Sequence, residues 1–186
     1  MTQPRLKTER LLLRPYEAGD AADVQRLAGD RAIADTTLNI PHPYEDGMAE
    51  PWIAQTHEQF AAGERATFAA VLTGTDALVG AVSLDVDKAA NAAVLGYWVG
   101  QPYWNQGYAT EAALRVVAWG FDALGLNRIH SSHFTRNPAS GAVMRKIGLV
   151  HEGCAREAVL KWGRYEDLEL YALLKRDWNT DSPRRG

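Results

Sequence analysis

The segment over residues 96–112 places groups that bind anions at the start of a predicted helix. A strand-like run ends at Val99, a turn follows, and Gly107 opens a long helical pattern. The first amides of a helix have no partner within the helix, and the helix dipole makes this end positive. We therefore predict an anion site on the backbone of residues 106–110, where Gly107 lets a pyrophosphate approach and Ala109 keeps the wall thin. Spacing alone favours a simpler alternative, a capped helix whose amides bind water.

A second predicted helix start combines a capping residue with a hydroxyl group. Asn137 suits the N-cap position and Pro138 the first helical position, which leaves the Ser140 hydroxyl near the mouth of the helix. A plain capped helix explains this arrangement. The functional alternative is that Asn137 and Ser140 face a ligand between this helix and the preceding strand.

Several other kinds of site lack support in the sequence. Neither the G-x-x-x-x-G-K-[ST] loop nor the G-x-G-x-x-G motif is present. His130 and His133 are three residues apart on a predicted strand, so they point to opposite faces and share no metal ion. We expect no metal site. Cys154 is the only cysteine, which excludes an internal disulfide and indicates a reducing, cytoplasmic location.

The composition is that of a globular protein. The chain has 186 residues, 46% of them hydrophobic, with 20 basic residues against 23 acidic ones and a net charge of -3. We expect a single domain over residues 1–186, with flexible tails at 1–4 and 182–186. The charge offers no bulk positive field for nucleic acid or an anionic membrane, and no apolar run approaches the roughly 20 residues that span a bilayer.

The hydrophobic periodicity predicts a mixed sheet of fold class α/β (α+β). The element order is β-α-α-β-β-β-α-β-α-β-β, in which the three central strands form an antiparallel meander and helices cover both faces. The strand at 92–99 is apolar on both faces, so we expect it to be covered on both sides. Asp20 is expected to cap the first helix. The predicted strands are 6–14, 67–72, 78–86, 92–99, 128–134, 150–160 and 165–173, and the predicted helices are 20–29, 48–63, 107–124 and 137–147.

Several short segments carry a family resemblance through their shared order, which covers nearly the whole chain. They are residues 8–15 (TERLLLRP), 40–44 (IPHPY), 97–111 (YWVGQPYWNQGYATE), Asn137-x-x-Ser140, 148–153 (GLVHEG), 163–167 (GRYED) and 170–174 (LYALL). In this order they resemble the GNAT superfamily of acyl-CoA N-acyltransferases. Within it, they are similar to the branch that acetylates the N-terminal amines of ribosomal proteins (RimJ/RimL-like).

The resemblance implies that acetyl-CoA binds where the strands at 92–99 and 128–134 splay apart. The pantetheine arm would pair with the backbone of Trp98 and Val99, and Asn137 would hold it. A backbone amide at or next to Val99 would stabilise the oxyanion. Trp104 occupies a position where the superfamily pattern usually has Gln or Arg, a departure common in this branch. The pyrophosphate would lie on the amides of Gln106, Gly107, Tyr108, Ala109 and Thr110, and Arg145 or Lys146 would lie near the adenosine phosphates.

The chemistry of acyl transfer to an amine sets further requirements. An amine attacks only when neutral, and an α-amine with a pKa near 8 is about 10% neutral at pH 7, whereas a lysine is well under about 0.1% neutral. The departing thiolate gains from a proton donor within hydrogen-bond reach. The resemblance makes Ser140 the first candidate for this catalytic role, and Tyr108 is the second.

No residue stands out as the general base. Members of the family carry a glutamate at positions that hold Val94 and Val159 in this chain. Glu111 and Asp85 remain, as do a water relay and direct attack by the neutral fraction of an α-amine. Glu111 lies in the first turn of a predicted helix, where a structural role facing the dipole is favoured.

We therefore expect an acetyl-CoA-dependent N-acetyltransferase that acts by direct attack of a primary amine on the thioester. The expected acceptor is a protein or peptide N-terminal α-amine. The alternatives are a small amine (a polyamine, an aminoglycoside or an amino acid) and a non-catalytic acyl-CoA-binding module. Trp52 and residues 165–167 are candidates for the acceptor mouth. The sequence is compatible with a monomer or a homodimer.

Overall fold

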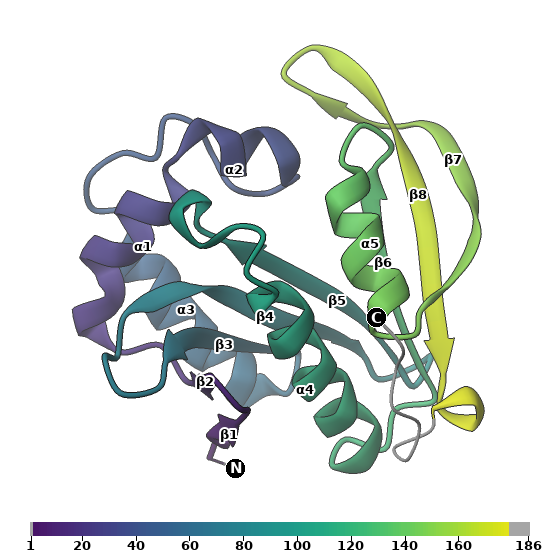
Figure 1. Ribbon diagram of the computed structural model, residues 1–186, viewed down its shortest axis with the longest axis horizontal. Coiled ribbons are helices and arrows are strands. Elements are labelled where there is room, and N and C mark those ends of the chain that lie inside the picture. Colours follow the sequence, from purple (N-terminus) through teal and green to yellow (C-terminus); the bar gives the residue numbers. More distant parts are fainter. Residues whose placement is uncertain (1, 179–186) are drawn as a thin grey trace.

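One mixed sheet organises residues 2–178, the part of the chain that the computed structural model describes (Figure 1). Within these residues eight strands lie in the order β1-β2-β3-β4-β5-β6-β8-β7, and helices pack on both faces, which confirms the predicted fold class. The strands are β1 (Leu6–Lys7), β2 (Leu11–Arg14), β3 (Arg65–Leu72), β4 (Leu78–Asp87), β5 (Ala92–Val99), β6 (Arg128–Phe134), β7 (Val150–Lys161) and β8 (Arg164–Leu174), and the α-helices are α1 (Ala21–Ala28), α2 (Arg31–Thr36), α3 (Ala49–Ala62), α4 (Tyr108–Asp122) and α5 (Pro138–Lys146).

The N-terminal segment differs from the single strand predicted over 6–14. It forms a hairpin of β1 and β2, because Glu111 of α4 holds the turn between them. The Glu111 carboxylate accepts hydrogen bonds from Thr8 Oγ1 at 2.6 Å and from the Arg10 backbone amide at 2.8 Å. Within the expected tail at 1–4, Gln3 Nε2 donates to Thr67 O at 2.8 Å, and residue 1 lies outside the described residues. The other expected tail, 182–186, lies outside the described residues.

The helical layer on one face contains a helix that periodicity did not predict and a cap that differs from the expected one. The six-residue helix α2 follows α1 and leads into the segment at 37–48. Asp20 makes no side-chain cap to α1. Its carboxylate instead accepts two hydrogen bonds from the Arg14 guanidinium, at 2.7 and 2.8 Å, and one from the Glu17 amide at 2.7 Å. The predicted helix at 48–63 is confirmed as α3, and it ends at Gly63 in the left-handed conformation.

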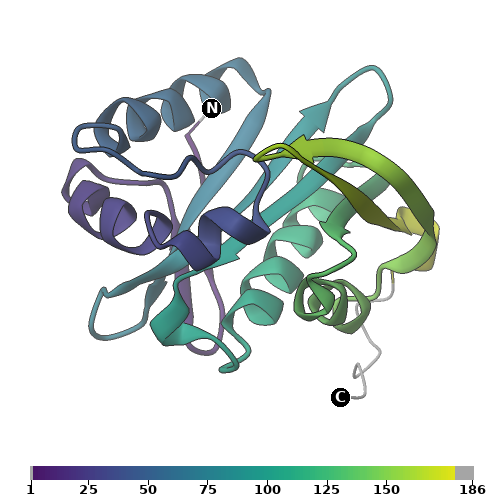
Figure 2. The ribbon, with the colours of Figure 1, turned by 90° about the horizontal axis from the view of Figure 1, so that it is seen from above.

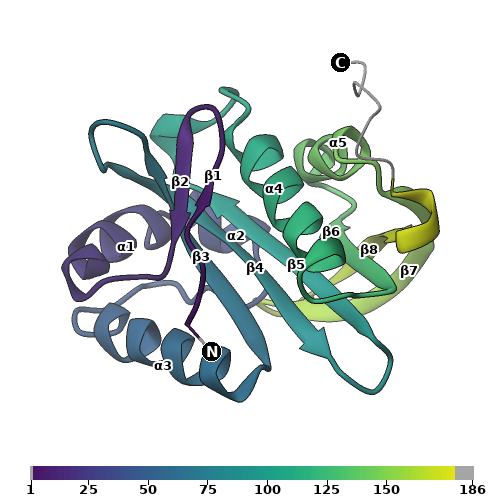
Figure 3. The same ribbon diagram turned by 90° about the horizontal axis from the view of Figure 1, so that it is seen from below.

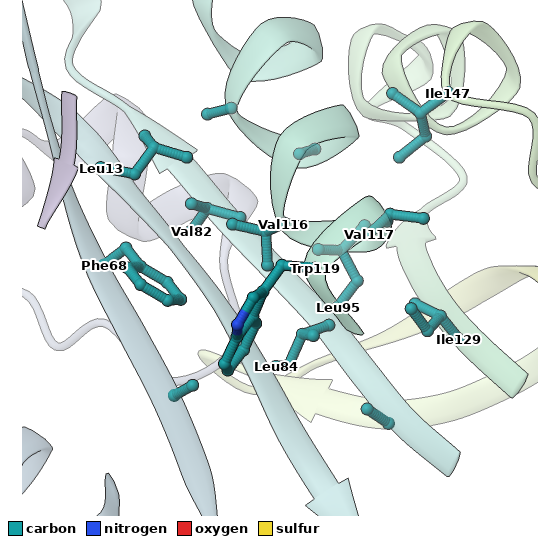
Figure 4. Close-up of a cluster of buried hydrophobic side chains, with 14 of the residues drawn as sticks. Leu13, Phe68, Val82, Leu84, Leu95, Val116, Val117, Trp119, Ile129 and Ile147 are labelled. Atoms are coloured by element: carbon teal, nitrogen blue, oxygen red, sulfur yellow. The ribbon is translucent and has the colours of Figure 1, made fainter. Parts of the chain in front are cut away.

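The core is centred on the antiparallel meander β3-β4-β5, which confirms the prediction for these strands. Helix α4 covers one face and places Trp119 edge-on against Phe68, with ring centroids 5.4 Å apart (Figure 4). Leu95 of β5 is buried in the same cluster, and each such fully buried side chain contributes about 1.5–3 kcal/mol. Helices α1 and α3 pack on the opposite face over Ala69 and Ala81.

Strand β5 is covered on both faces, but on one of them only in part. Toward α4, Leu95 is buried. On the other face Ala92 is buried and Trp98 packs against the cluster under α1 and α3, whereas Val94 is 42% exposed. Strand β5 also pairs with β6 in parallel only from Ala92 to Val94. Beyond Val94 the two strands separate and leave one edge of β5 without a strand partner.

The C-terminal half extends the sheet through β6, β8 and β7 and adds α5 beside α4 (Figure 3). The long hairpin β7-β8 reaches back toward the segment that follows α2 (Figure 2). Among residues 2–178, no helix is long and apolar enough to cross a membrane.

Candidate active site

A large cleft of about 890 Å³ opens where β5 and β6 separate. Its walls come from β3, β4, β5, β6, the N-terminus of α4, one side of α5, and α2 with the segment after it. The structure brings most of the predicted site residues together in this cleft. Those that line it are Trp98, Val99, Gly107, Tyr108, Ala109, Thr110, Asn137 and Ser140.

Two predicted residues, Gln106 and Arg145, do not line the cleft. The Gln106 side chain donates to Pro102 O at 3.2 Å. Arg145 is exposed and donates to the Tyr171 hydroxyl at 3.0 Å. Its neighbour Lys146, the alternative named from the sequence, is the cation on the cleft side of α5.

The start of α4 has the geometry of an anion site. Gly107 adopts the left-handed conformation at φ 83°, and no side chain caps the helix. A Cβ added to Gly107 would lie 3.3 Å from Arg10 Nη2, so the position is both strained and crowded for other residues. The amides of residues 108–110 therefore face the cleft at the positive end of the helix, and a pyrophosphate fits there.

Glu111 and Arg10 hold this loop in shape. Arg10 Nε donates to Glu111 Oε2 at 2.7 Å, and Arg10 Nη1 donates to Gln106 O at 2.9 Å. Burial raises the pKa of the Glu111 carboxyl, but the hydrogen bonds from Thr8 and Arg10 outweigh it, and the pKa is lowered. Glu111 is thus an ionised structural residue that does not line the cleft, which removes it as a candidate base.

The free edge of β5 is the second feature that fits the pantetheine arm. Ser131 Oγ donates to Leu95 O at 2.8 Å, which shows that this backbone group faces β6. Alternate residues of a strand present their backbone to the same side, so the backbone groups of Tyr97 and Val99 also face the cleft. The backbone of Trp98 faces β4, and only its side chain enters the cleft. Trp104 Nε1 already donates to Val99 O at 2.6 Å, which leaves the Val99 amide as the available group.

Ser140 is paired with Tyr97, which was not among the predicted catalytic or cofactor-binding residues. Tyr97 Oη lies 2.8 Å from Ser140 Oγ and donates to Ser140 O at 3.0 Å. Burial raises the pKa of the Tyr97 phenol, so this group stays protonated at neutral pH. Asn137 Oδ1 accepts from the Ser140 amide at 3.4 Å, which confirms Asn137 as the N-cap of α5. The two hydroxyl groups lie within hydrogen-bond distance of each other, and both residues line the cleft.

Tyr108, the second candidate donor, lies on the opposite wall at the start of α4. The Arg10 guanidinium sits 4.7 Å from the centroid of its ring, and Tyr103 packs edge-on against it at 6.4 Å. These contacts fix the ring at the end of the cleft that holds the predicted anion site, residues 106–110, called the phosphate loop below.

No Asp or Glu lines the cleft within residues 2–178. Val159 pairs in the ladder with Glu166, whose carboxylate accepts from Arg136 Nε at 2.9 Å. Asp85, the other candidate base, is bound to Arg65 and does not line the cleft. The structure thus offers no carboxylate base at the cleft wall. These residues also contain no group of three His, Cys, Asp or Glu side chains able to hold a metal ion.

Two contacts join α2 and the segment after it to the β7-β8 hairpin, which lies beside them (Figure 2). Arg136 Nη1 binds Asp35 Oδ2 at 2.7 Å while its Nε binds Glu166, so one side chain joins the two elements. Lys161 Nζ donates to Leu38 O at 3.3 Å. Trp52 lines the cleft. Residues 165–167 lie outside its lining, and Glu166 among them binds Arg136.

The comparisons with known proteins agree with this geometry. A family profile described as an acetyltransferase (GNAT) domain matches residues 10–150. The chain belongs to the GNAT acetyltransferase family. This confirms the resemblance read from the sequence, and it makes the protein an acetyl-CoA-dependent N-acetyltransferase.

Individual relatives extend over most of the chain. The N-acetyltransferase YnaD of Bacillus subtilis is 30% identical over 176 residues, which cover 94% of this chain and 99% of YnaD. The crystal structure of a GNAT-family acetyltransferase from Bacillus anthracis superimposes with a TM-score of 0.82 at 26% identity, covering 93% of this chain and 99% of that one. The [Ribosomal protein uS5]-alanine N-acetyltransferase of Escherichia coli is 30% identical over 88 residues, 47% of this chain and 45% of that protein.

Proposed function

We propose that this acetyltransferase acts on the α-amine of a protein or peptide N-terminus. The observation that carries the proposal is the absence of Asp and Glu from the cleft lining in residues 2–178. An acceptor that needs a carboxylate base, such as a lysine side chain, finds none among these lining residues. An α-amine with a pKa near 8 is already about 10% neutral at pH 7 and attacks without one.

The same observation disfavours polyamines and aminoglycosides as acceptors. These molecules carry several positive charges, and desolvating them in a cleft without carboxylates is costly. The E. coli relative supports an N-terminal acceptor, since its name describes acetylation of alanine in ribosomal protein uS5. The proposal implies a cytoplasmic enzyme, in keeping with a lone cysteine, Cys154.

The residues on the cleft wall have separate proposed roles. The amides of residues 108–110 bind the pyrophosphate, and the Tyr97 and Val99 backbone groups pair with the pantetheine arm, with the Val99 amide polarising the thioester carbonyl. Asn137 flanks the arm, and Lys146 approaches the adenosine phosphates in place of Arg145. The amine attacks the carbonyl carbon, the C–S bond breaks, and the sulfur takes its proton from Ser140. The amine loses a proton to water once its nitrogen is bonded to the carbonyl carbon, and a proton from water restores the Ser140 hydroxyl, so the protons balance.

The test is acetyl-CoA-dependent thiol release by the purified protein across a panel of amines. The panel contains peptides with the N-terminal sequences of ribosomal proteins, the same peptides blocked at the α-amine but carrying a free lysine, and a polyamine, an aminoglycoside and free amino acids. We expect release with free α-amines and none with the blocked peptides. Equal release with blocked peptides or with polyamines would refute the proposal, and silence with every amine despite acetyl-CoA binding would favour a non-catalytic acyl-CoA-binding module.

A further inference from the structure

A single arginine lies in the half of the cleft that is farther from the phosphate loop. Arg65 opens β3 and lines the cleft, and it stands across β4 from the point where β5 leaves β6. The register places Arg65 beside Asp85, and Asp85 beside Val94. The phosphate loop follows the other end of β5, after Val99. Arg65 is thus at the acceptor end, on the face of the sheet opposite α4.

The contacts of Arg65 hold its guanidinium from one side. Nη2 donates to the Oγ of buried Ser83 at 3.1 Å. Nε lies 3.1 Å from Asp85 Oδ1, at an angle that makes no hydrogen bond, and it is buried. Nη1 has no hydrogen-bond partner among residues 2–178, and the side chain as a whole is 32% exposed. The guanidinium therefore keeps free donors on its Nη1 end while its other end is fixed.

Asp85 supports this cation from outside the cleft lining. A carboxylate behind an arginine lowers the cost of removing the guanidinium from water and fixes its plane. The remaining donors then suit a planar anion. Because Asp85 offsets much of the charge and no second cation contacts Arg65, the site fits a monoanion better than a phosphate dianion.

The path between Arg65 and the reacting end of β5 is short. Ser83, which binds Arg65, pairs with Gly96 in the ladder. A Cβ added to Gly96 would lie 3.0 Å from Ser83 Oγ, so glycine leaves the surface between them open. An acceptor whose amine approaches Tyr97 and Val99 therefore has its neighbouring atoms over Gly96 and beside Arg65.

We propose that Arg65 binds a carboxylate group of the acceptor, close to the amine that is acetylated. The inference rests on the proposed function and narrows its substrate class. The carboxylate is either the α-carboxylate of a free amino acid or the side chain of an acidic residue just after a peptide N-terminus. Ser83 and Asp85 position the guanidinium, and Arg65 selects the acceptor.

The experiment compares acceptors with and without the carboxylate. One arm uses alanine against alaninamide, with kcat/KM calculated per neutral amine because the carboxylate also raises the pKa of the amine, and the other uses C-terminally amidated peptides with Asp or Asn at the second position. We expect kcat/KM to favour the carboxylate by about 10- to 100-fold in at least one arm, and that arm identifies the source of the carboxylate. Equal rates in both arms overturn the role of Arg65 but leave the proposed function standing, whereas an absence of thiol release with every amine overturns the proposed function.

Variants of the arginine complete the test. R65Q should abolish the preference for the carboxylate while leaving KM for acetyl-CoA unchanged, and R65K should retain part of it. D85N keeps the cation but removes the carboxylate that positions it, so the preference should weaken without being abolished, with KM for acetyl-CoA unchanged. The matched control is R176Q, because Arg176 has an 80% exposed side chain outside the cleft. A preference that survives in R65Q refutes the assignment.

Discussion

Replacing Ser140 with alanine removes one oxygen from the cleft wall and leaves the rest of α5 in place. The Ser140 amide keeps its acceptor, Asn137 Oδ1, and Tyr97 Oη keeps Ser140 O as its acceptor at 3.0 Å. Only the 2.8 Å contact between the two hydroxyl groups is lost. A neutral hydrogen bond contributes about 0.5–1.5 kcal/mol, so we expect the variant to fold and to bind acetyl-CoA.

The catalytic loss should be much larger than this structural cost. A positioned general acid contributes about 100- to 10,000-fold in rate, which corresponds to roughly 2.7–5.4 kcal/mol of barrier at 1.36 kcal/mol per tenfold. We therefore expect kcat of S140A to fall by at least about 100-fold, with KM for acetyl-CoA changed by less than about threefold. If Ser140 were only a packing residue, the loss would stay within about tenfold.

The matched variant is Y97F, which keeps the ring and removes the hydroxyl that supports Ser140. Ser140 retains its own proton in this variant, so we expect kcat to fall only about fivefold, the equivalent of one hydrogen bond. The raised pKa of Tyr97 means that the phenol stays protonated through neutral pH and above, so its titration should not limit the rate between about pH 6 and 9.

Stopped or continuous assays of thiol release measure kcat and the KM for acetyl-CoA, with one substrate varied while the other is saturating. An S140A rate within about tenfold of wild type would show that the serine is not the donor. Y108F would then be the next variant, because Tyr108 is the other hydroxyl group predicted for this role on the cleft wall.

Three further substitutions test acetyl-CoA binding at Gly107 and the stability of the fold at Asp20 and Gly141. G107A should raise the Kd for acetyl-CoA by about tenfold, because alanine in the left-handed conformation of Gly107 costs about 1–2 kcal/mol. An unchanged Kd in titration calorimetry would count against binding of the pyrophosphate at Gly107. D20N should lower the free energy of unfolding at pH 7. Burial raises the pKa of the Asp20 carboxyl, but the hydrogen bonds from Arg14 outweigh this effect and the pKa is lowered. The stabilisation by Asp20 is therefore present above the unfolded pKa of about 3.9 and is lost as the pH falls below that value. An equal difference in unfolding free energy between wild type and D20N at pH 7 and at about pH 2.5 would contradict this expectation. In G141A the new Cβ would lie 2.4 Å from His133 Nε2. Overpacking that costs about 1–3 kcal/mol should lower Tm by roughly 2–12 °C. An unchanged Tm in calorimetry would mean that the His133 ring moves aside without cost.

The elements with strong local signals were predictable from the sequence. The N-cap at Asn137 and the apolar alternation of the meander depend on neighbours in the chain, and both predictions are confirmed. The turn that begins at Thr8 and separates β1 from β2 was not predictable, because it depends on Glu111, a residue 103 positions away in the chain. Helix α2 was missed because six residues are too few for a helical period to show.

The site shows the same division between local and distant information. The helix start at Gly107 was predictable from residue types, whereas its use as an anion site was implied by the family resemblance. The contact of Tyr97 with Ser140 was not predictable, since alternation reports the face of a strand and not the partner of a hydroxyl group. Lys146 could have been preferred over Arg145, because it follows cleft-lining Ala139 and Val143 at helical spacing. Arg65 gave no local signal at all.

The bond between the N-terminal hairpin and α4 also constrains the order in which the enzyme folds. The contacts of Glu111 with Thr8 and Arg10 span 103 and 101 residues, so they add strongly to the contact order of the chain. During synthesis at about 5–20 residues per second, the hairpin waits roughly 5–20 s before its partner exists. The loop that we propose binds the donor substrate is therefore completed late, and removing or blocking the first ten residues should release that loop although none of them has a proposed role in the chemistry.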